Sequence, residues 1–242
     1  MMMMMSGRRV RAIVRKELRE YRRNRSILAS MAIFPLIFLI QPLVVAVSLS
    51  ESSSAALGQM HLLLDMLGIP VLTPVMLAAY AVAGERQQGS LEPVLTTPIP
   101  REEFLLGKAL AVLLPSVAIA YGVYAIFLLC IAGFAQPAVV SAILRPSDIA
   151  AQVLFTPLLA CWSTWVAIAI STRLSDVRVA QQISLLASLP MVLVPALVAF
   201  DAIHPTLGLT VGFGVVLLIA DAIGWRIVAP MFDRERLITG TR

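Results

Sequence analysis

The charged residues most able to do chemistry lie in one polar stretch, GERQQGSLEPVLTTPIPREEFLLGK, at residues 84–108. This stretch holds seven charged side chains, whereas charged residues make up only 14% of the chain. Apolar runs long enough to cross a membrane lie on both sides of it. Such a stretch is either a solvated connecting loop or a compact folded segment that passes a push from a soluble partner to the two spans it joins.

A second group of ionisable residues falls inside apolar runs, where charge is costly and often functional. His61 and Asp65 lie one helical turn apart and are able to pair. Asp221 stands five residues before Arg226 in the last apolar run. Asp221, Asp65 and His61 are therefore candidates for a transport path. The alternative is that His61 and Asp65 pair at the membrane surface, and that Arg226 satisfies Asp221, without contact with a substrate.

The sequence contains no recognisable catalytic or metal-binding pattern. Its only histidines are His61 and His204, and neither a G-x-S-x-G elbow nor an H-E-x-x-H zinc motif is present. The two cysteines lie in apolar runs without metal-ligand spacing. We therefore expect no enzyme, no metal and no cofactor in this chain.

The elements that position these residues are predicted to be membrane-spanning helices. Of the 242 residues, 59% are hydrophobic, and the mean hydropathy is +0.89, well above the values usual for soluble domains. The apolar runs are too long and continuous for the strands of a membrane barrel, so each is predicted to be a helix. The sequence thus predicts an all-α membrane protein with six transmembrane helices, which lie at 27–48, 61–83, 109–134, 149–172, 182–201 and 206–228.

The distribution of basic residues predicts the orientation. All of the 19 Lys and Arg residues except Arg145 lie before the first span, in the second and fourth connections, or in the C-terminal flank that begins at Arg226. Because basic flanks stay on the cytoplasmic side, both termini and the stretch at 84–108 are predicted to be cytoplasmic, in the cell membrane. The net charge of +5 is explained by this topology, and no nucleic acid partner is expected.

The N-terminal residues 8–26 are predicted to form an amphipathic helix in the membrane interface, next to the lipid. One interpretation is a basic topology anchor without a protein partner. The other is a helix that also touches a soluble partner, which Glu17 and Glu20 favour because a lipid anchor has little use for acids. The apolar stripe of this helix consists of Val10, Ile13, Val14, Leu18 and Tyr21.

The Gly, Ser and Pro residues of the polar stretch predict a folded shape. Gly89 is suited to the left-handed end of the second span, and Ser90 is suited to cap a short helix that stops at Pro98. Glu102 and Glu103 then fall in the first turn of the helix that continues into the third span, where the helix dipole favours acids. The expected order is helix, break, short amphipathic helix, break and helix.

These residues resemble the signature of the type-2 ATP-binding-cassette (ABC) exporter permeases, in the segment around their coupling helix. The resemblance extends to the number of spans and the basic N-terminal helix, although Gln87 and Pro93 depart from the usual pattern. The matching positions are Glu85, Arg86, Gly89, Ser90, Leu91, Glu92, Pro98, Gly107 and Lys108.

The resemblance implies a single-domain permease, residues 1–242, whose bundle at 27–228 pairs with a second copy or a similar permease. It also implies a separate ABC ATPase subunit that binds ATP and Mg and docks on residues 84–108. The sequence agrees, because REEFLLGKA has Glu102 and Ala109 at positions where a phosphate loop needs Gly and Ser or Thr. An ion-coupled secondary transporter is the alternative function, although no paired repeat indicates one.

Overall fold

The computed structural model describes residues 6–48, 62–87, 89, 99–199 and 206–232, and within these ranges it is helical with no strand. The second predicted span is built from four consecutive pieces: α4 (Leu62–Asp65), α5 (Gly68–Ala79), the π-helix η2 (Tyr80–Gly84) and α6 (Glu85–Gln87). The other elements are α1 (Gly7–Arg23), α2 (Arg25–Ser48), α8 (Arg101–Phe134), α9 (Pro137–Ile143), α10 (Pro146–Arg173), α11 (Val177–Ala199), α12 (Leu207–Val228) and the 3-10 turn η3 (Ala229–Phe232).

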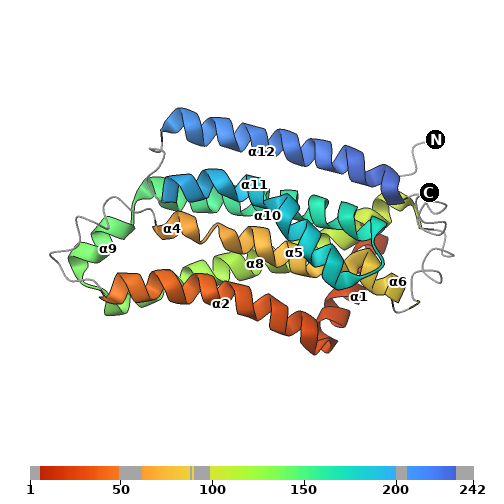
Figure 1. Ribbon diagram of the computed structural model, residues 1–242, viewed down its shortest axis with the longest axis horizontal. Coiled ribbons are helices and arrows are strands. Elements are labelled where there is room, and N and C mark those ends of the chain that lie inside the picture. Colours follow the sequence, from red (N-terminus) through yellow and green to blue (C-terminus); the bar gives the residue numbers. More distant parts are fainter. Residues whose placement is uncertain (1–5, 49–61, 88, 90–98, 200–205, 233–242) are drawn as a thin grey trace.

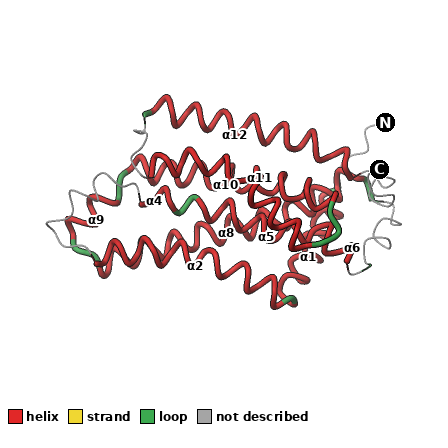
Figure 2. The backbone as a smooth tube through the Cα atoms, viewed as in Figure 1, coloured by secondary structure: helices red, strands yellow, loops and turns green. Residues whose placement is uncertain are grey.

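The long helices run side by side along the longest axis of the molecule (Figure 1). At one end α1 turns sharply away from α2 and lies near α6 and η3, and at the other end lie α4 and α9. The backbone tube shows that only short loops interrupt the helices in the described ranges (Figure 2). We call the end that carries α1, α6 and η3 the charged end, and the end that carries α9 the far end.

Five apolar segments are long and apolar enough to cross a membrane, namely Arg25–Ser48, Leu62–Gln87, Arg101–Phe134, Pro146–Arg173 and Gly208–Met231. They coincide with the predicted first, second, third, fourth and sixth spans. The predicted fifth span falls in α11, where the apolar stretch Val177–Leu193 is shorter. The all-helical membrane fold is therefore confirmed, while the count of six spans stays a prediction.

Helix α5 is the centre of the bundle. In the second span 89% of the most apolar window is buried, compared with 22% in α8 and 24% in α2. Helix α5 contacts α2, α8, α10 and α11. Small residues allow this close approach, because Ala78, Ala79, Ala81 and Ala83 are fully buried and leave room for neighbouring backbones.

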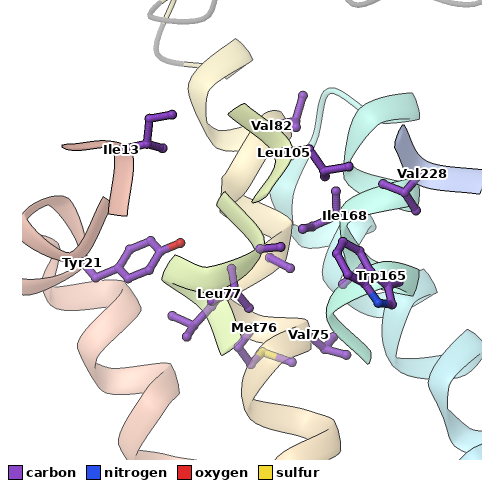
Figure 3. Packing of buried hydrophobic residues seen from close by; sticks show 14 of the residues in the cluster. Ile13, Tyr21, Val75, Met76, Leu77, Val82, Leu105, Trp165, Ile168 and Val228 are labelled. Atoms are coloured by element: carbon purple, nitrogen blue, oxygen red, sulfur yellow. The ribbon is translucent and has the colours of Figure 1, made fainter. Parts of the chain in front are cut away.

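The core near the charged end joins α1 to the spans. Ile13 and Tyr21 from α1 belong to the same buried cluster as Leu77 from α5, Leu105 from α8 and Ile168 from α10 (Figure 3). The apolar stripe predicted for α1 is thus confirmed as its packing face. Its predicted range, 8–26, extends past the observed end at Arg23, where Asn24 separates α1 from α2.

Helices α10 and α12 pack through aromatic rings. Trp165 and Trp225 meet edge to face with 5.5 Å between their centroids. Gly224 permits this contact, because a Cβ atom there would lie 2.9 Å from Cδ1 of Trp165. The interaction fixes the last span against the rest of the bundle near the charged end.

The two ends of the polar stretch at 84–108 follow the prediction. Gly89 has a φ of 65° and closes the turn after α6, and Glu102 and Glu103 lie in the first turn of α8. The third span therefore begins at Arg101, eight residues before the apolar run at 109–134. The predicted short helix, including Ser90, Leu91, Glu92 and Pro98, lies outside the described residues.

Candidate functional site at the charged end

Lys108 is the centre of a buried ionic cluster at the charged end. Its side chain is fully buried, and its Nζ atom lies 2.9 Å from Oε2 of Glu85 and 3.1 Å from Oε1 of Glu17. The same ammonium group donates a hydrogen bond of 2.6 Å to the carbonyl oxygen of Ala81. The oxygens of Glu17 and Ala81 accept hydrogen bonds from the ammonium group, and Glu85 adds an ion pair, so the buried charge is compensated.

Phe104, one turn before Lys108 on α8, lies under this ammonium group. Nζ of Lys108 is 5.0 Å from the centroid of the Phe104 ring, within the range of a cation–π interaction. The ring shields the cluster on the side where no carboxylate lies. Lys108 therefore connects α8 with α1, through Glu17, and with the end of the second span, through Glu85.

Lys16 closes the cluster on its solvent side. Its Nζ atom lies 2.6 Å from Oε1 of Glu85 and 3.3 Å from carboxylate oxygens of both Glu17 and Glu20. Burial alone would lower the pKa of Lys16, but the three carboxylates outweigh it and raise this pKa above its ordinary value. Lys16 is therefore held as a cation among these acids.

Glu17 is the matching buried anion. Its residue exposure is only 3%. Burial alone would raise the pKa of Glu17, but Lys108 and Lys16 outweigh it and lower this pKa below its usual range. Glu17 therefore does not support the interpretation that α1 touches a soluble partner, because its carboxylate is buried and pairs with Lys108.

The π-helix Tyr80–Gly84 supplies the backbone part of the cluster. Its wide turn leaves backbone groups without the usual partners, and side chains from other helices satisfy them. Ser171 of α10 accepts hydrogen bonds from the amides of Val82 (3.2 Å) and Ala83 (2.9 Å) and donates one to the carbonyl oxygen of Ala79. Lys108 satisfies the carbonyl oxygen of Ala81. The π turn is thus held by α8 and α10 together.

Arg86 ties the end of the second span to α10. Its Nη1 and Nη2 atoms donate hydrogen bonds of 3.1 and 3.2 Å to the carbonyl oxygens of Leu174 and Thr172. These carbonyls lie at the C-terminal end of α10, where the helix leaves its last carbonyl groups unpaired. The neighbouring residues Glu85 and Arg86 therefore bind different helices.

The first turn of α1 is fixed in the same way. Oε1 of Glu103, a side chain that is almost fully buried, accepts a hydrogen bond of 2.7 Å from the backbone amide of Ser6. Arg9 approaches Oε2 of Glu103 at 3.2 Å. The start of α8 thereby satisfies the positive N-terminal end of α1.

Gly107 lets α1 and α8 touch. A Cβ atom at this position would lie 2.7 Å from Cγ2 and 2.8 Å from Cβ of Ile13, closer than real contacts allow. The Gly-Lys pair of the signature therefore has two physical roles in this chain. Gly107 permits the close approach of α1, and Lys108 forms an ion pair with Glu17 of α1.

The structure thus brings together Glu85, Arg86, Gly107 and Lys108 among the predicted site residues. Sequence reasoning missed Lys16, Ser171 and Glu103 as parts of the site. A signal for Glu17 was present, since it stands four residues from both Ile13 and Tyr21 and therefore on the apolar face of the helix.

The predicted transport-path residues lie away from this cluster. Asp65 ends α4 toward the far end, and His61 lies outside the described residues. Oδ1 of Asp221, in α12, is buried without a hydrogen-bond partner in the described part of the chain, and no ion pair joins Asp221 to Arg226. The structure therefore does not gather Asp65 and Asp221 into one site.

A small cavity of about 50 Å³ lies toward the far end, between the second span and α10, α11 and α12. Its wall is mostly apolar and includes Leu64, Phe155 and Phe213, with Asp148 and Thr210 as polar members. The carboxylate of Asp148, a residue only 3% exposed, accepts a hydrogen bond from the hydroxyl of Ser147.

Fold and site together define the class: an all-helical protein with several membrane-spanning helices and a buried ionic cluster at one end. The sequence model of the family described as "ABC-2 family transporter protein" matches residues 11–219. The chain belongs to this family, as its resemblance to type-2 exporter permeases predicted. It is a membrane protein of the ABC transporters, in which the ATPase activity resides in a separate subunit. A search of curated proteins gave no significant match.

Proposed function

We propose that this chain is the permease subunit of an ATP-driven exporter, and that the ionic cluster transmits movement from a separate ATPase to the membrane helices. The six spans lie with both termini in the cytoplasm of the cell membrane, and two permease chains pair with two ATPase copies. ATP and Mg bind the ATPase. Residues 84–108 form the coupling segment, on which the ATPase docks.

The ion pair of 2.9 Å between Lys108 and Glu85 carries this proposal. These two residues stand at opposite ends of the coupling segment, so the pair clamps the base of the segment. Glu17 adds α1 to the same clamp, at 3.1 Å from Lys108. A push on the segment between them therefore displaces α1, the second span and α8 as one body.

We assign two roles to the signature residues. Glu85 and Lys108 are buried and already hold carboxylate and ammonium partners, so their role is internal transmission. The segment between Gly89 and Pro98, with Ser90, Leu91 and Glu92, is assigned to contact with the ATPase. Arg86 passes the same displacement to α10 through Leu174 and Thr172.

The test is co-expression of the chain with the ATPase encoded nearest to it, followed by co-purification and ATP turnover. Glu92→Lys is expected to lose the ATPase, because it reverses the charge of the assigned contact. Glu51→Lys is the matched control, since it makes the same change in the predicted outer connection. If both variants retain the ATPase equally, the docking assignment is wrong. Gradient-driven uptake by the purified chain alone, abolished by Asp221→Asn, would instead support the ion-coupled alternative.

A further inference from the structure

The face of α1 that points away from the bundle is a groove lined by arginine. Arg15, Arg19, Arg22 and Arg23 surround a space of about 580 Å³, and Leu18, which also packs against the core, lies at its edge. The four arginines are exposed, and within the described residues none of them has an ion-pair partner. No acid lines this groove, so its positive charge is not neutralised by the chain itself in the described part.

The opposite face of α1 shows the contrast. The cleft there is lined by Glu17, Glu20 and Glu85, and Lys16 lies among these acids. Arg23 stands at the boundary and lines both spaces, whereas Arg15, Arg19 and Arg22 line only the groove, away from these acids. On the outer face Arg15 and Arg19 stand four residues apart, as do Arg19 and Arg23, and such like-charge pairs destabilise a helix unless an anion neutralises them.

The position of the groove indicates the anion. Asn24 alone separates α1 from α2, and exposed apolar side chains begin on α2 at Leu28 and continue through Ile33 and Ile37. Leu28 stands three residues into α2, or about 4.5 Å along its axis from Arg25, so the end of α1 lies next to the start of the apolar surface. This is the level of the lipid headgroups, where arginine side chains bind phosphate with two parallel hydrogen bonds.

We propose that Arg15, Arg19, Arg22 and Arg23 form a binding groove for the phosphate headgroups of anionic phospholipids. The bound lipid neutralises the outer face of α1 and holds the helix against the bundle, where Glu17 pairs with Lys108. Lipid composition thereby acts on the ionic cluster through the two faces of one helix. The groove requires only that α2 crosses a membrane, and it does not depend on the ATPase.

The test uses the full-length chain in detergent with phosphatidylglycerol or phosphatidylcholine, and native mass spectrometry counts the retained lipids. The variant is Arg15→Gln with Arg19→Gln and Arg22→Gln. Its matched control is Arg173→Gln with Arg178→Gln and Arg226→Gln, which removes three exposed arginines from the same end of the bundle. We expect the affinity for phosphatidylglycerol to fall about fivefold for each arginine removed from α1, and to change little in the control.

Equal affinity in the wild type and the α1 variant overturns the proposal, as does an equal loss in both triple variants. Loss of the co-purified ATPase with unchanged lipid affinity also overturns it, because the face would then bind protein. A wild type that retains phosphatidylglycerol but binds no ATPase leaves the groove intact and contradicts only the proposed function. If the triple variant does not fold, Arg19→Gln against Arg178→Gln gives the same comparison, with an expected difference of about fivefold.

Discussion

The charged end and the interior of the bundle differ in whether their buried polar groups have partners. At the charged end Glu17, Glu85, Glu103 and Lys108 are at most 4% exposed, and each lies in an ion pair. The interior holds uncharged polar side chains that are equally buried but have no hydrogen-bond partner in the described part of the chain. These are Thr73, Gln152, Thr156, Ser163, Ser184 and Ser188.

The difference shows which region is stabilised in this conformation and which is not. Ion pairs with several partners fix the relative positions of α1, α6 and α8, so the charged end behaves as a rigid unit. Buried polar groups without partners are unfavourable, so this conformation leaves the interior less stabilised than a conformation in which water or a polar partner reaches these groups. We infer that the charged end transmits movement and that the interior is where the bundle changes shape.

The largest expected effect comes from removing the central cation. Lys108→Met leaves Glu17 and Glu85 buried near only one remaining cation, and we expect a loss of about 3–5 kcal/mol in the free energy of unfolding. Unfolding in a titration with sodium dodecyl sulfate measures it. Lys16→Met is the matched control, with a loss of about 1 kcal/mol or less, because the side chain of Lys16 is 40% exposed and Lys108 continues to pair both acids. Equal losses in the two variants would contradict the central role of Lys108.

A smaller effect is expected at the contact between α1 and α8. Gly107→Ala places a Cβ atom 2.7 Å from Cγ2 of Ile13 and is expected to cost about 1–3 kcal/mol. Gly122→Ala, on the same helix, has no atom within 4 Å and is expected to be neutral or to stabilise by up to about 1 kcal/mol. The same titration compares them. If both glycines tolerate alanine, α1 does not pack on α8 as described.

Removing a buried polar group from the interior is expected to raise the stability of the protein. Gln152→Leu removes an amide whose oxygen and nitrogen both lack a hydrogen-bond partner, so stability is expected to rise by about 1 kcal/mol or more. Thr164→Val is the control on the same helix, because Thr164 donates a hydrogen bond of 2.7 Å to the carbonyl oxygen of Ala160. This control is expected to lose up to about 1 kcal/mol. A stability loss in Gln152→Leu would remove the contrast between the two regions.

The smallest expected effect is a dependence of stability on pH under acidic conditions. The pKa of Glu17 in the folded protein lies below the ordinary value of 4.5, so its contribution to stability is fully present above pH 4.5. It is lost as the pH falls through the lowered folded pKa. We expect the difference in stability between the wild type and Glu17→Gln to be constant above pH 5 and to shrink below 4.5. A difference that stays constant throughout would show that Glu17 carries no buried charge.

The sequence was sufficient for the features that depend on local composition. Apolar length predicted five membrane-spanning segments that the structure contains, the helical spacing of apolar residues predicted the packing face of α1, and Gly89 predicted the left-handed turn after α6. The break between α4 and α5 and the short helix α9 were not predicted. Pro137 begins α9 and Gly68 begins α5, but Pro115 lies inside the continuous helix α8, so such residues do not by themselves mark a boundary.

Contacts between residues that are distant in the chain could not be predicted from local sequence. Glu17 and Lys108 are far apart in the chain, and their contact depends on how α1 folds back against α8. The π turn at Tyr80–Gly84 was also missed, because its stability depends on Ser171 from another helix. Helical periodicity reports which face of a helix is apolar, but it does not report which charged residue that face meets.

The most direct test of the central claim is whether the ionic cluster carries an ATP-driven movement to the far end. Thr210→Cys places a thiol in the wall of the far-end cavity, in a chain whose native Cys130 and Cys161 are replaced by serine. The rate of modification by a thiol reagent is measured in the permease–ATPase complex, with and without ATP and vanadate. We expect ATP and vanadate to change this rate in the otherwise wild-type chain, and Glu17→Gln to abolish the change while the ATPase stays bound. An equal change in both chains would contradict transmission through the cluster.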